Sequence, residues 1–180
     1  MLIMIFSESY ELYYDPKIES STGRLLGVEC HPRYKVDDGV TLSSNFFIRN
    51  VYSTNKNYEM FLFTLKESTK HLRDIQTPLR IYVSVKVEDI ICYDLAKAIR
   101  VQCVKSGVAI NSIFLELDDI SIKDGDEELF VKLDRLINIG VNILVKGEKY
   151  KSVILYSSRL SKLKIKFNVI LDSIKKKYHR

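Results

Sequence analysis

Charged or polar side chains stand where several apolar runs of the sequence end. In chain order these positions are Glu29, Ser84, Glu116 with Asp118 and Asp119, Lys146 and Lys166. Carboxylate oxygens, together with an amide oxygen, could hold Mg²⁺. Ammonium groups have no lone pair to donate and they repel the ion, so a site that mixes carboxylates with amines favours ion pairs over a metal centre.

The elements that would position these residues alternate between strands and helices. Extended segments are expected around 11–14 and 24–29, with a turn at 20–23 between them, and an amphipathic helix is expected over 58–73. Further strands are expected at 79–87, 113–117, 141–145 and 163–167. Helices are expected over 91–103, from the cap at 124–126 to Gly140, around 152–160, and finally toward Lys177.

Single helices between strands predict a parallel sheet, whose reactive groups would lie at the carboxyl ends of the strands. No glycine-rich loop follows a strand, which argues against a Rossmann or P-loop nucleotide module. A complete β/α barrel takes about 250 residues. We therefore expect an α/β fold in one domain over residues 1–180, an incomplete TIM-like (β/α) barrel with about five or six strands.

The composition is that of a folded domain, with 46% hydrophobic and 28% charged residues. No apolar run reaches the roughly 20 residues that cross a bilayer, and the first residues do not read as a secretory signal, so we expect a cytoplasmic protein without a membrane partner. Cys30, Cys92 and Cys103 lack disulfide or zinc spacing and are expected to be idle thiols. Residues 151–180 hold nine Lys or Arg against one acid, Asp172, which could meet nucleic acid or an acidic protein.

Several motifs, in a consistent order, resemble those of EAL domains. Residues 14–16 (YDP) and 23–34 (GRLLGVECHPRY) resemble the opening YQP and GxEALxRW of that family, with Glu29 and Arg33 kept. Residues 83–86 (VSVK) resemble its VNxS, with Ser84 at the position of the Asn ligand. Residues 115–119 (LELDD) resemble LExTE, with Glu116 kept and Asp119 in place of the second Glu.

Two further motifs depart from the family at charged positions. Residues 140–147 (GVNILVKG) lie where EAL domains have GVxLALDD, so Lys146 and Gly147 replace two aspartates. Residues 163–166 (LKIK) resemble LKID, with Lys164 kept and Lys166 at the position of the Asp. The family's later strands have no counterpart before Arg180, which is the reason to expect an incomplete barrel.

The resemblance implies a lost activity. EAL domains hydrolyse cyclic di-GMP with two divalent ions, and two lysines in place of carboxylates imply no metal, no cofactor, no catalytic residue and no enzyme. We expect Lys164 and Lys166 to point into the barrel mouth and to form ion pairs there with Glu29, Glu116 and Asp119, unless the strand ends are open to water and the charges are only solvated. His31 is expected to be a packed or rim histidine.

Inactive members of the family imply a function in regulation. The resemblance implies a bacterial protein that binds another protein, with transcription regulators such as the flagellar activator FlhD as candidate partners and motility or biofilm as the process. A homodimer is a second way to cover open strand edges. The alternatives are a non-hydrolysing cyclic di-GMP receptor, which Arg33 favours and Asp15 disfavours, and a nucleic-acid-binding module that uses the basic C-terminal segment.

Overall fold

An antiparallel hairpin opens the part of the chain that the computed structural model describes, which comprises residues 10–19, 21–35, 41–43, 54–75, 79–118, 127–147 and 150–155. Strand β1 (Tyr10–Ile18) pairs with β2 (Leu25–Lys35), and Gly23 adopts φ 70° in the turn. This confirms the predicted hairpin. Pro16 has no N–H to donate, and β1 tolerates it because, among the described strands, β1 pairs only with β2.

The sheet is parallel at its centre and antiparallel at both edges. Its remaining strands are β3 (Thr41–Ser43), β4 (Arg80–Ser84), β5 (Ile113–Asp118), β6 (Asn142–Gly147) and β7 (Tyr150–Leu155). Their order is β1-β2-β4-β5-β6-β7, with β3 paired to β2, and the contacts from β2 through β6 along this path are parallel. The α/β prediction is confirmed, and an incomplete barrel is consistent with this sheet. The described strands number seven rather than five or six.

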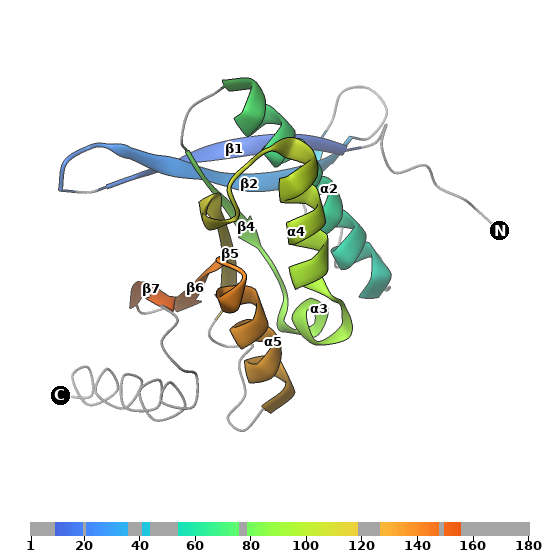
Figure 1. Ribbon diagram of the computed structural model, residues 1–180. Helices are drawn as coiled ribbons and strands as arrows, with labels where there is room; N and C mark the ends of the chain where they lie inside the picture. The colour runs from blue at the N-terminus through green and yellow to red at the C-terminus, as the bar shows by residue number, and fades with distance from the viewer. Residues whose placement is uncertain are drawn as a thin grey trace.

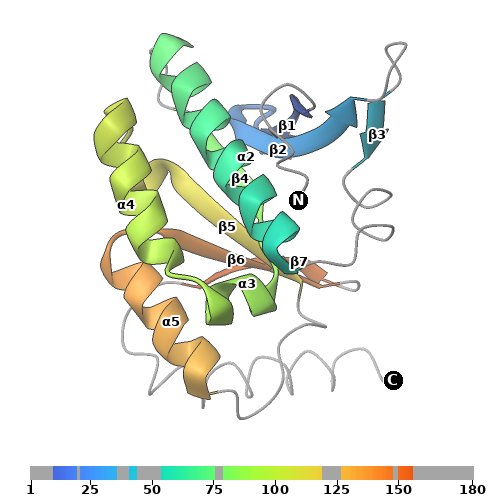
Figure 2. The same ribbon diagram turned by 90° about the vertical axis from the view of Figure 1, so that its right-hand side faces the viewer.

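The α-helices of the described residues, four in number, pack on one face of the sheet, an arrangement that can be followed in Figures 1 and 2. They are α2 (Thr54–Ile75), α3 (Val87–Cys92), α4 (Leu95–Ser106) and α5 (Glu127–Asn138), and a short 3-10 turn, η2 (Ile110–Ser112), precedes β5. Helix α4 ends at Gly107 and α5 ends just before Gly140, both in the left-handed region with φ 71° and 100°, as the sequence predicts.

The two faces of the sheet have different compositions because side chains alternate along each strand. On the helix side, Ile81, Val83, Leu115 and Ile143 belong to one buried cluster that also takes in apolar residues of all four helices. On the opposite face a smaller cluster joins Tyr82, Phe114 and Leu144. That second face also carries Glu29 and Glu116, which are described below.

The structure corrects three of the predicted elements. The predicted helix around 152–160 is wrong over 152–155, where β7 pairs antiparallel with β6; a short apolar run does not distinguish strand from helix, and pairing with β6 decides it. The strand predicted at 79–87 ends at Ser84, and α3 begins at Val87. The helix predicted over 91–103 is divided between α3 and α4, because Asp94 caps a new helix by accepting a hydrogen bond from Lys97 N–H at 3.0 Å.

Four predicted features lie outside the described residues, namely the cap at 124–126, residues 156–160 of the predicted helix, the strand at 163–167 and the last helix toward Lys177. Of the helices that are described, none combines the length and the apolar character needed to cross a bilayer. Cys30, Cys92 and Cys103 are free, as predicted.

Candidate functional site

Strand register places two carboxylates on the sheet face opposite the helices. Glu29 of β2 is in register with Tyr82 of β4, and Ser84 of β4 is in register with Glu116 of β5. Because alternate residues share a face, Glu29, Tyr82 and Glu116 point away from the helix-side core. The Glu116 side chain is fully enclosed, and the Glu29 side chain is 17% exposed.

A lysine from the hairpin lies between these two carboxylates. Lys17 Nζ on β1 is 2.9 Å from Glu29 Oε2 and 2.6 Å from Glu116 Oε1. The same amine lies 4.9 Å from the centre of the Tyr82 ring, within the range of a cation–π contact. We call Lys17, Glu29 and Glu116 the internal-cation cluster.

The surroundings keep the Lys17 amine charged. Burial by itself lowers the pKa of Lys17, but hydrogen bonds and charge from Glu116 and Glu29 outweigh it, so that the pKa is raised above its ordinary 10.5. At neutral pH the cluster therefore holds the Lys17 ammonium between the carboxyl groups of Glu29 and Glu116.

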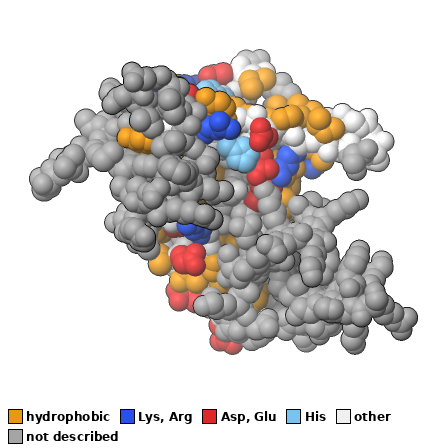
Figure 3. Space-filling view, turned by 180° about the vertical axis from the view of Figure 1, so that it is seen from behind, with side chains coloured by type: hydrophobic (Ala, Val, Ile, Leu, Met, Phe, Trp, Pro, Cys, Tyr) orange, Lys and Arg blue, Asp and Glu red, His pale blue; other side chains and the backbone are white. Residues whose placement is uncertain are grey.

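Further charged groups of the hairpin extend from this cluster. His31 Nε2 lies 3.2 Å from Asp15 Oδ2 and 3.9 Å from Glu29 Oε1. The Arg33 guanidinium lies 4.3 Å from the centre of the Tyr13 ring. Figure 3 shows histidine, acidic and basic side chains next to one another on the described surface. The His31 side chain is about one third exposed, which is compatible with the predicted packed or rim histidine.

The described donors, Glu29 and Glu116, do not form an open site for a pair of divalent ions. Glu29 and Glu116 supply the hard oxygen atoms that Mg²⁺ prefers, but the Lys17 amine lies within 3 Å of both carboxylates, where an ion would have to bind. Across the residues whose side chains are described, no group of three or more His, Cys, Asp and Glu is arranged to hold a metal ion.

The other predicted site residues fall into two groups. Ser84 is exposed at the end of β4, and Lys146 is in register with Asp118 on β6 and β5. Asp119, Lys164 and Lys166 lie outside the described residues, so their ion pairs stay a prediction. The structure thus brings together Glu29 and Glu116, with Ser84 beside Glu116 in register.

Sequence reasoning missed Lys17. Alternation along an extended 10–18 segment places Lys17 on the same face as Asp15, but only the register of β1 with β2 sets Asp15 opposite Glu29. The prediction ended the extended segment at Pro16 and so left Lys17 outside it.

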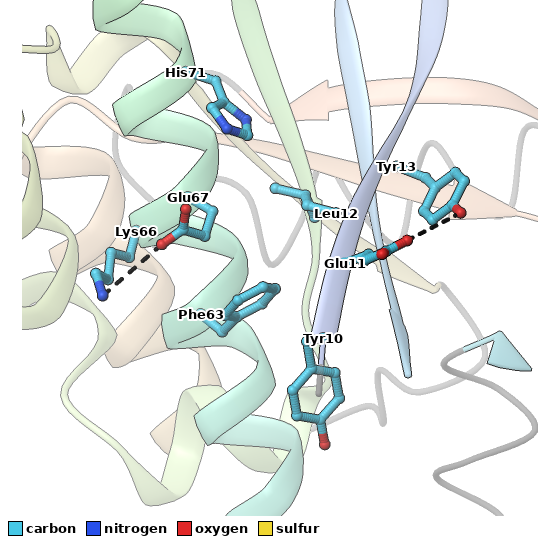
Figure 4. Close-up of a pocket in the computed structure, with 8 residues that line it drawn as sticks. All are labelled: Tyr10, Glu11, Leu12, Tyr13, Phe63, Lys66, Glu67 and His71. Atoms are coloured by element: carbon cyan, nitrogen blue, oxygen red, sulfur yellow. Dashed lines mark hydrogen bonds and ion pairs between the residues drawn. The ribbon is translucent and has the colours of Figure 1, made fainter. Parts of the chain in front are cut away.

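A hollow lies between β1 and α2 and has a volume of about 430 Å³. It is lined from both faces of β1, by Tyr10 and Leu12 on one and Glu11 and Tyr13 on the other, so it follows the outer edge of that strand (Figure 4). Phe63 of α2 contacts Tyr10 across it, with ring centres 5.6 Å apart. None of Lys17, Glu29 and Glu116 lines this hollow, so it is separate from the internal-cation cluster.

Another hollow, of about 470 Å³, lies between α2 and α4. Its lining includes the buried Leu65, the half-buried Ala98 and the exposed Leu62 and Val101. Gln102 Nε2 donates a hydrogen bond to Thr69 Oγ1 at 2.9 Å and so ties the two helices together beside it. We call this hollow the α2–α4 groove.

No protein-family model and no curated protein sequence matches the chain. Solved structures do match its fold. The chain is similar to the PaMucR phosphodiesterase in complex with c-di-GMP, with a TM-score of 0.69 and 19% identity, over 86% of this chain and 64% of that one. It is also similar to the Bacillus subtilis YkuI protein, which has an EAL domain and was solved with c-di-GMP and calcium (TM-score 0.66, 15% identity, 77% of this chain and 35% of that one).

A third similar structure is the Xanthomonas citri FimX EAL domain in complex with c-diGMP, with a TM-score of 0.65 and 14% identity, over 75% of this chain and 53% of that one. The chain spans less than two thirds of each of these three proteins. At such identities the likeness concerns the fold. The chain therefore has an EAL-like fold, as its motifs predict.

Proposed function

We propose that this chain is an EAL-like protein that does not hydrolyse cyclic di-GMP and that acts as a regulator by binding another protein. The observation that supports the loss of hydrolysis is the position of the Lys17 amine, 2.6 Å from Glu116 and 2.9 Å from Glu29. These are the two carboxylates that the EAL motifs imply as metal ligands, and here both serve an internal cation.

Electrostatic repulsion prevents the Lys17 ammonium and a divalent ion from lying between Glu29 and Glu116 at the same time. A divalent ion about 4 Å from an ammonium group is repelled by about 8 kcal/mol at an effective dielectric constant of about 20. A metal could bind between Glu29 and Glu116 only after Lys17 had left. Its departure would break two ion pairs, one of them to the fully enclosed Glu116 side chain.

A hydrolysis assay tests this proposal. The purified chain is incubated with cyclic di-GMP and either Mg²⁺ or Mn²⁺, and the linear dinucleotide is measured by chromatography. We expect no product above the protein-free blank with either metal. Turnover that depends on the metal and disappears with a Glu116→Gln variant would refute the proposal.

The protein-binding part of the proposal is supported by the motif resemblance to inactive regulatory EAL proteins. A transcription regulator such as FlhD is the partner class which that resemblance names. Calorimetry with purified FlhD tests the named partner directly. Absence of binding would remove FlhD as a candidate while leaving the hydrolysis result unaffected.

A cyclic di-GMP receptor is the second candidate function. It is favoured by the similar structures solved with that dinucleotide and by Arg33, a cation on the same strand face as Glu29. The internal-cation cluster has a formal charge of −1 and so repels a phosphodiester, which is why we place this candidate second. Calorimetry with cyclic di-GMP in the presence of EDTA decides between them, because micromolar binding without metal would favour the receptor.

A further inference from the structure

The α2–α4 groove exposes apolar side chains on the helix surface that faces away from the sheet. Leu62 on α2 is 36% exposed, and Val101 on α4 is 43% exposed. Val104, one turn beyond Val101, is 78% exposed. Figure 2 shows α2 and α4 side by side, and Leu62 and Val101 line the groove between them.

The groove lies along both helices. It follows α2 from Tyr58 to Lys66 and α4 from Asp94 to Gln102. Tyr58 stacks on Tyr93 at one end, with ring centres 3.9 Å apart and planes 3° apart. A furrow between two packed helices accepts the side-chain ridge of a third helix.

Basic side chains border these apolar residues. Lys66 and Lys97 line the groove from its two helices. Lys70 and Lys105 are exposed and continue the two borders, because each lies four residues beyond a lining position, Lys66 and Val101 respectively.

The acids Asp94 and Glu67 near the groove already have cationic partners, Arg135 for Asp94 and the border lysines Lys66 and Lys70 for Glu67. Asp94 lines the groove, but its Oδ2 is 3.0 Å from Arg135 Nη2 and its Oδ1 accepts a hydrogen bond from Lys97 N–H. The hydrogen bond from Lys97 N–H and the nearby Arg135 charge hold the pKa of Asp94 below its usual value. Glu67 lies 3.8 Å from Lys66 and 4.0 Å from Lys70. Exposed pairs at such distances are weak and leave the amines available to a second carboxylate.

We propose that the α2–α4 groove binds an amphipathic helix of a partner protein, a helix whose apolar side chains are flanked by Asp and Glu. This inference rests on the proposed protein-binding function and names the surface and the partner class. The partner's apolar side chains, spaced at three and four residues, pack on Leu62, Ala98 and Val101. Its acidic flanks meet Lys66 and Lys97, and charge complementarity selects it over basic or neutral helices.

The test uses the full chain and a labelled synthetic peptide of about 18 residues, with Leu at helical spacing and Glu on both flanks. Binding is followed by fluorescence anisotropy at about 0.05 M and about 0.3 M salt, which differ in electrostatic screening. The first comparison peptide has Lys in place of every Glu. We expect the acidic peptide to bind, the basic peptide not to bind, and the higher salt to weaken binding.

Two matched variants locate the binding surface. Val101→Glu puts a carboxylate into the groove and should weaken the acidic peptide at least about tenfold. Val131→Glu makes the same change on α5, where Val131 is 69% exposed outside the groove, and should leave binding unchanged. Circular dichroism checks that both variants fold, as expected for exposed positions.

Three results would overturn the inference. They are equal binding of the basic peptide, an equal effect of Val131→Glu, and the absence of binding by the acidic peptide. Sedimentation adds a fourth, because a wild-type dimer that Val101→Glu dissociates would assign the groove to a second copy of the chain. None of these results bears on hydrolysis of cyclic di-GMP, so failure of this surface and failure of the proposed loss of activity can be told apart.

Discussion

Replacing Lys17 by Met should destabilise the protein strongly for a single hairpin residue. The substitution keeps an unbranched side chain of similar length and removes the ammonium that faces Glu29 and Glu116. Removing one partner of a buried ion pair costs about 3–5 kcal/mol. Lys17 is 24% exposed, so we expect a value near the lower end, about 3 kcal/mol. For a chain of this length that corresponds to a fall in melting temperature of about 6–12 °C.

The assay is thermal unfolding in EDTA at pH about 7.5, with two control variants. Lys17→Arg keeps the charge and should lose much less stability than Lys17→Met. Lys66→Met breaks an exposed ion pair to Glu67, and should cost less than about 1 kcal/mol. Adding Glu116→Gln to Lys17→Met should recover part of the loss, because the enclosed carboxylate that has lost its cation is gone.

The pH dependence follows from the raised pKa of Lys17. A cationic group whose pKa is raised on folding contributes stability that is fully present below its unfolded pKa of 10.5 and is lost as the pH rises through the higher folded value. The difference between wild type and Lys17→Met should therefore be full at neutral pH and narrow only in strongly alkaline solution. Equal stability of the two proteins at neutral pH would show that the Lys17 charge does not stabilise the fold through Glu29 and Glu116.

Three further predictions concern positions outside the internal-cation cluster. Burial raises the pKa of Asp89 from 3.8 to about 6, so wild-type stability falls as the pH rises from the unfolded pKa of 3.8 through the folded pKa of about 6. Asp89→Asn should therefore be more stable than wild type by up to about 3 kcal/mol in urea unfolding at pH 7.5. At pH 3.5 the variant should be no more stable than wild type. Gly27→Ala should lower stability by about 1–3 kcal/mol or more in the same assay, because its Cβ would lie 2.3 Å from the Arg80 carbonyl oxygen. Tyr14→Phe removes the 2.5 Å hydrogen bond to His71 Nδ1 between β1 and α2 and should cost about 1 kcal/mol, whereas an unchanged unfolding midpoint would show that bond to be without net effect.

Most of the element order could be predicted because its signals are local. Helix α5 has its buried residues, Leu129, Leu133 and Leu136, at helical spacing, and Gly140 follows its end with positive φ. Strand β5 is a short apolar run that ends in acids. In each case the periodicity of the sequence and the packing of the folded chain favour the same structure.

The misplaced elements have less local information. Residues 152–155 include Val153, Ile154 and Leu155, which suit a strand or a buried helix equally, and only pairing with β6 decides between them. Tyr93 and Asp94 interrupt the helical pattern between α3 and α4 without changing its apolar spacing. The spacing of apolar residues in a single sequence does not reveal such a break.

The candidate site was half predictable for a similar reason. Glu29 and Glu116 could be assigned from their motifs, and the idea that a lysine takes the place of a metal came from Lys146 and Lys166. The lysine that does face both carboxylates, Lys17, comes from an antiparallel edge strand. Its reach depends on the register of β1 with β2, which is a long-range property that no local motif encodes.

The most direct measurement of the central claim is anomalous diffraction from crystals of the wild-type chain grown with MnCl₂ and collected at the manganese edge. We expect the Lys17 amine to lie between Glu29 and Glu116, and we expect no anomalous peak beside either carboxylate. A manganese peak bound by both carboxylates, with the Lys17 side chain turned away, would contradict it.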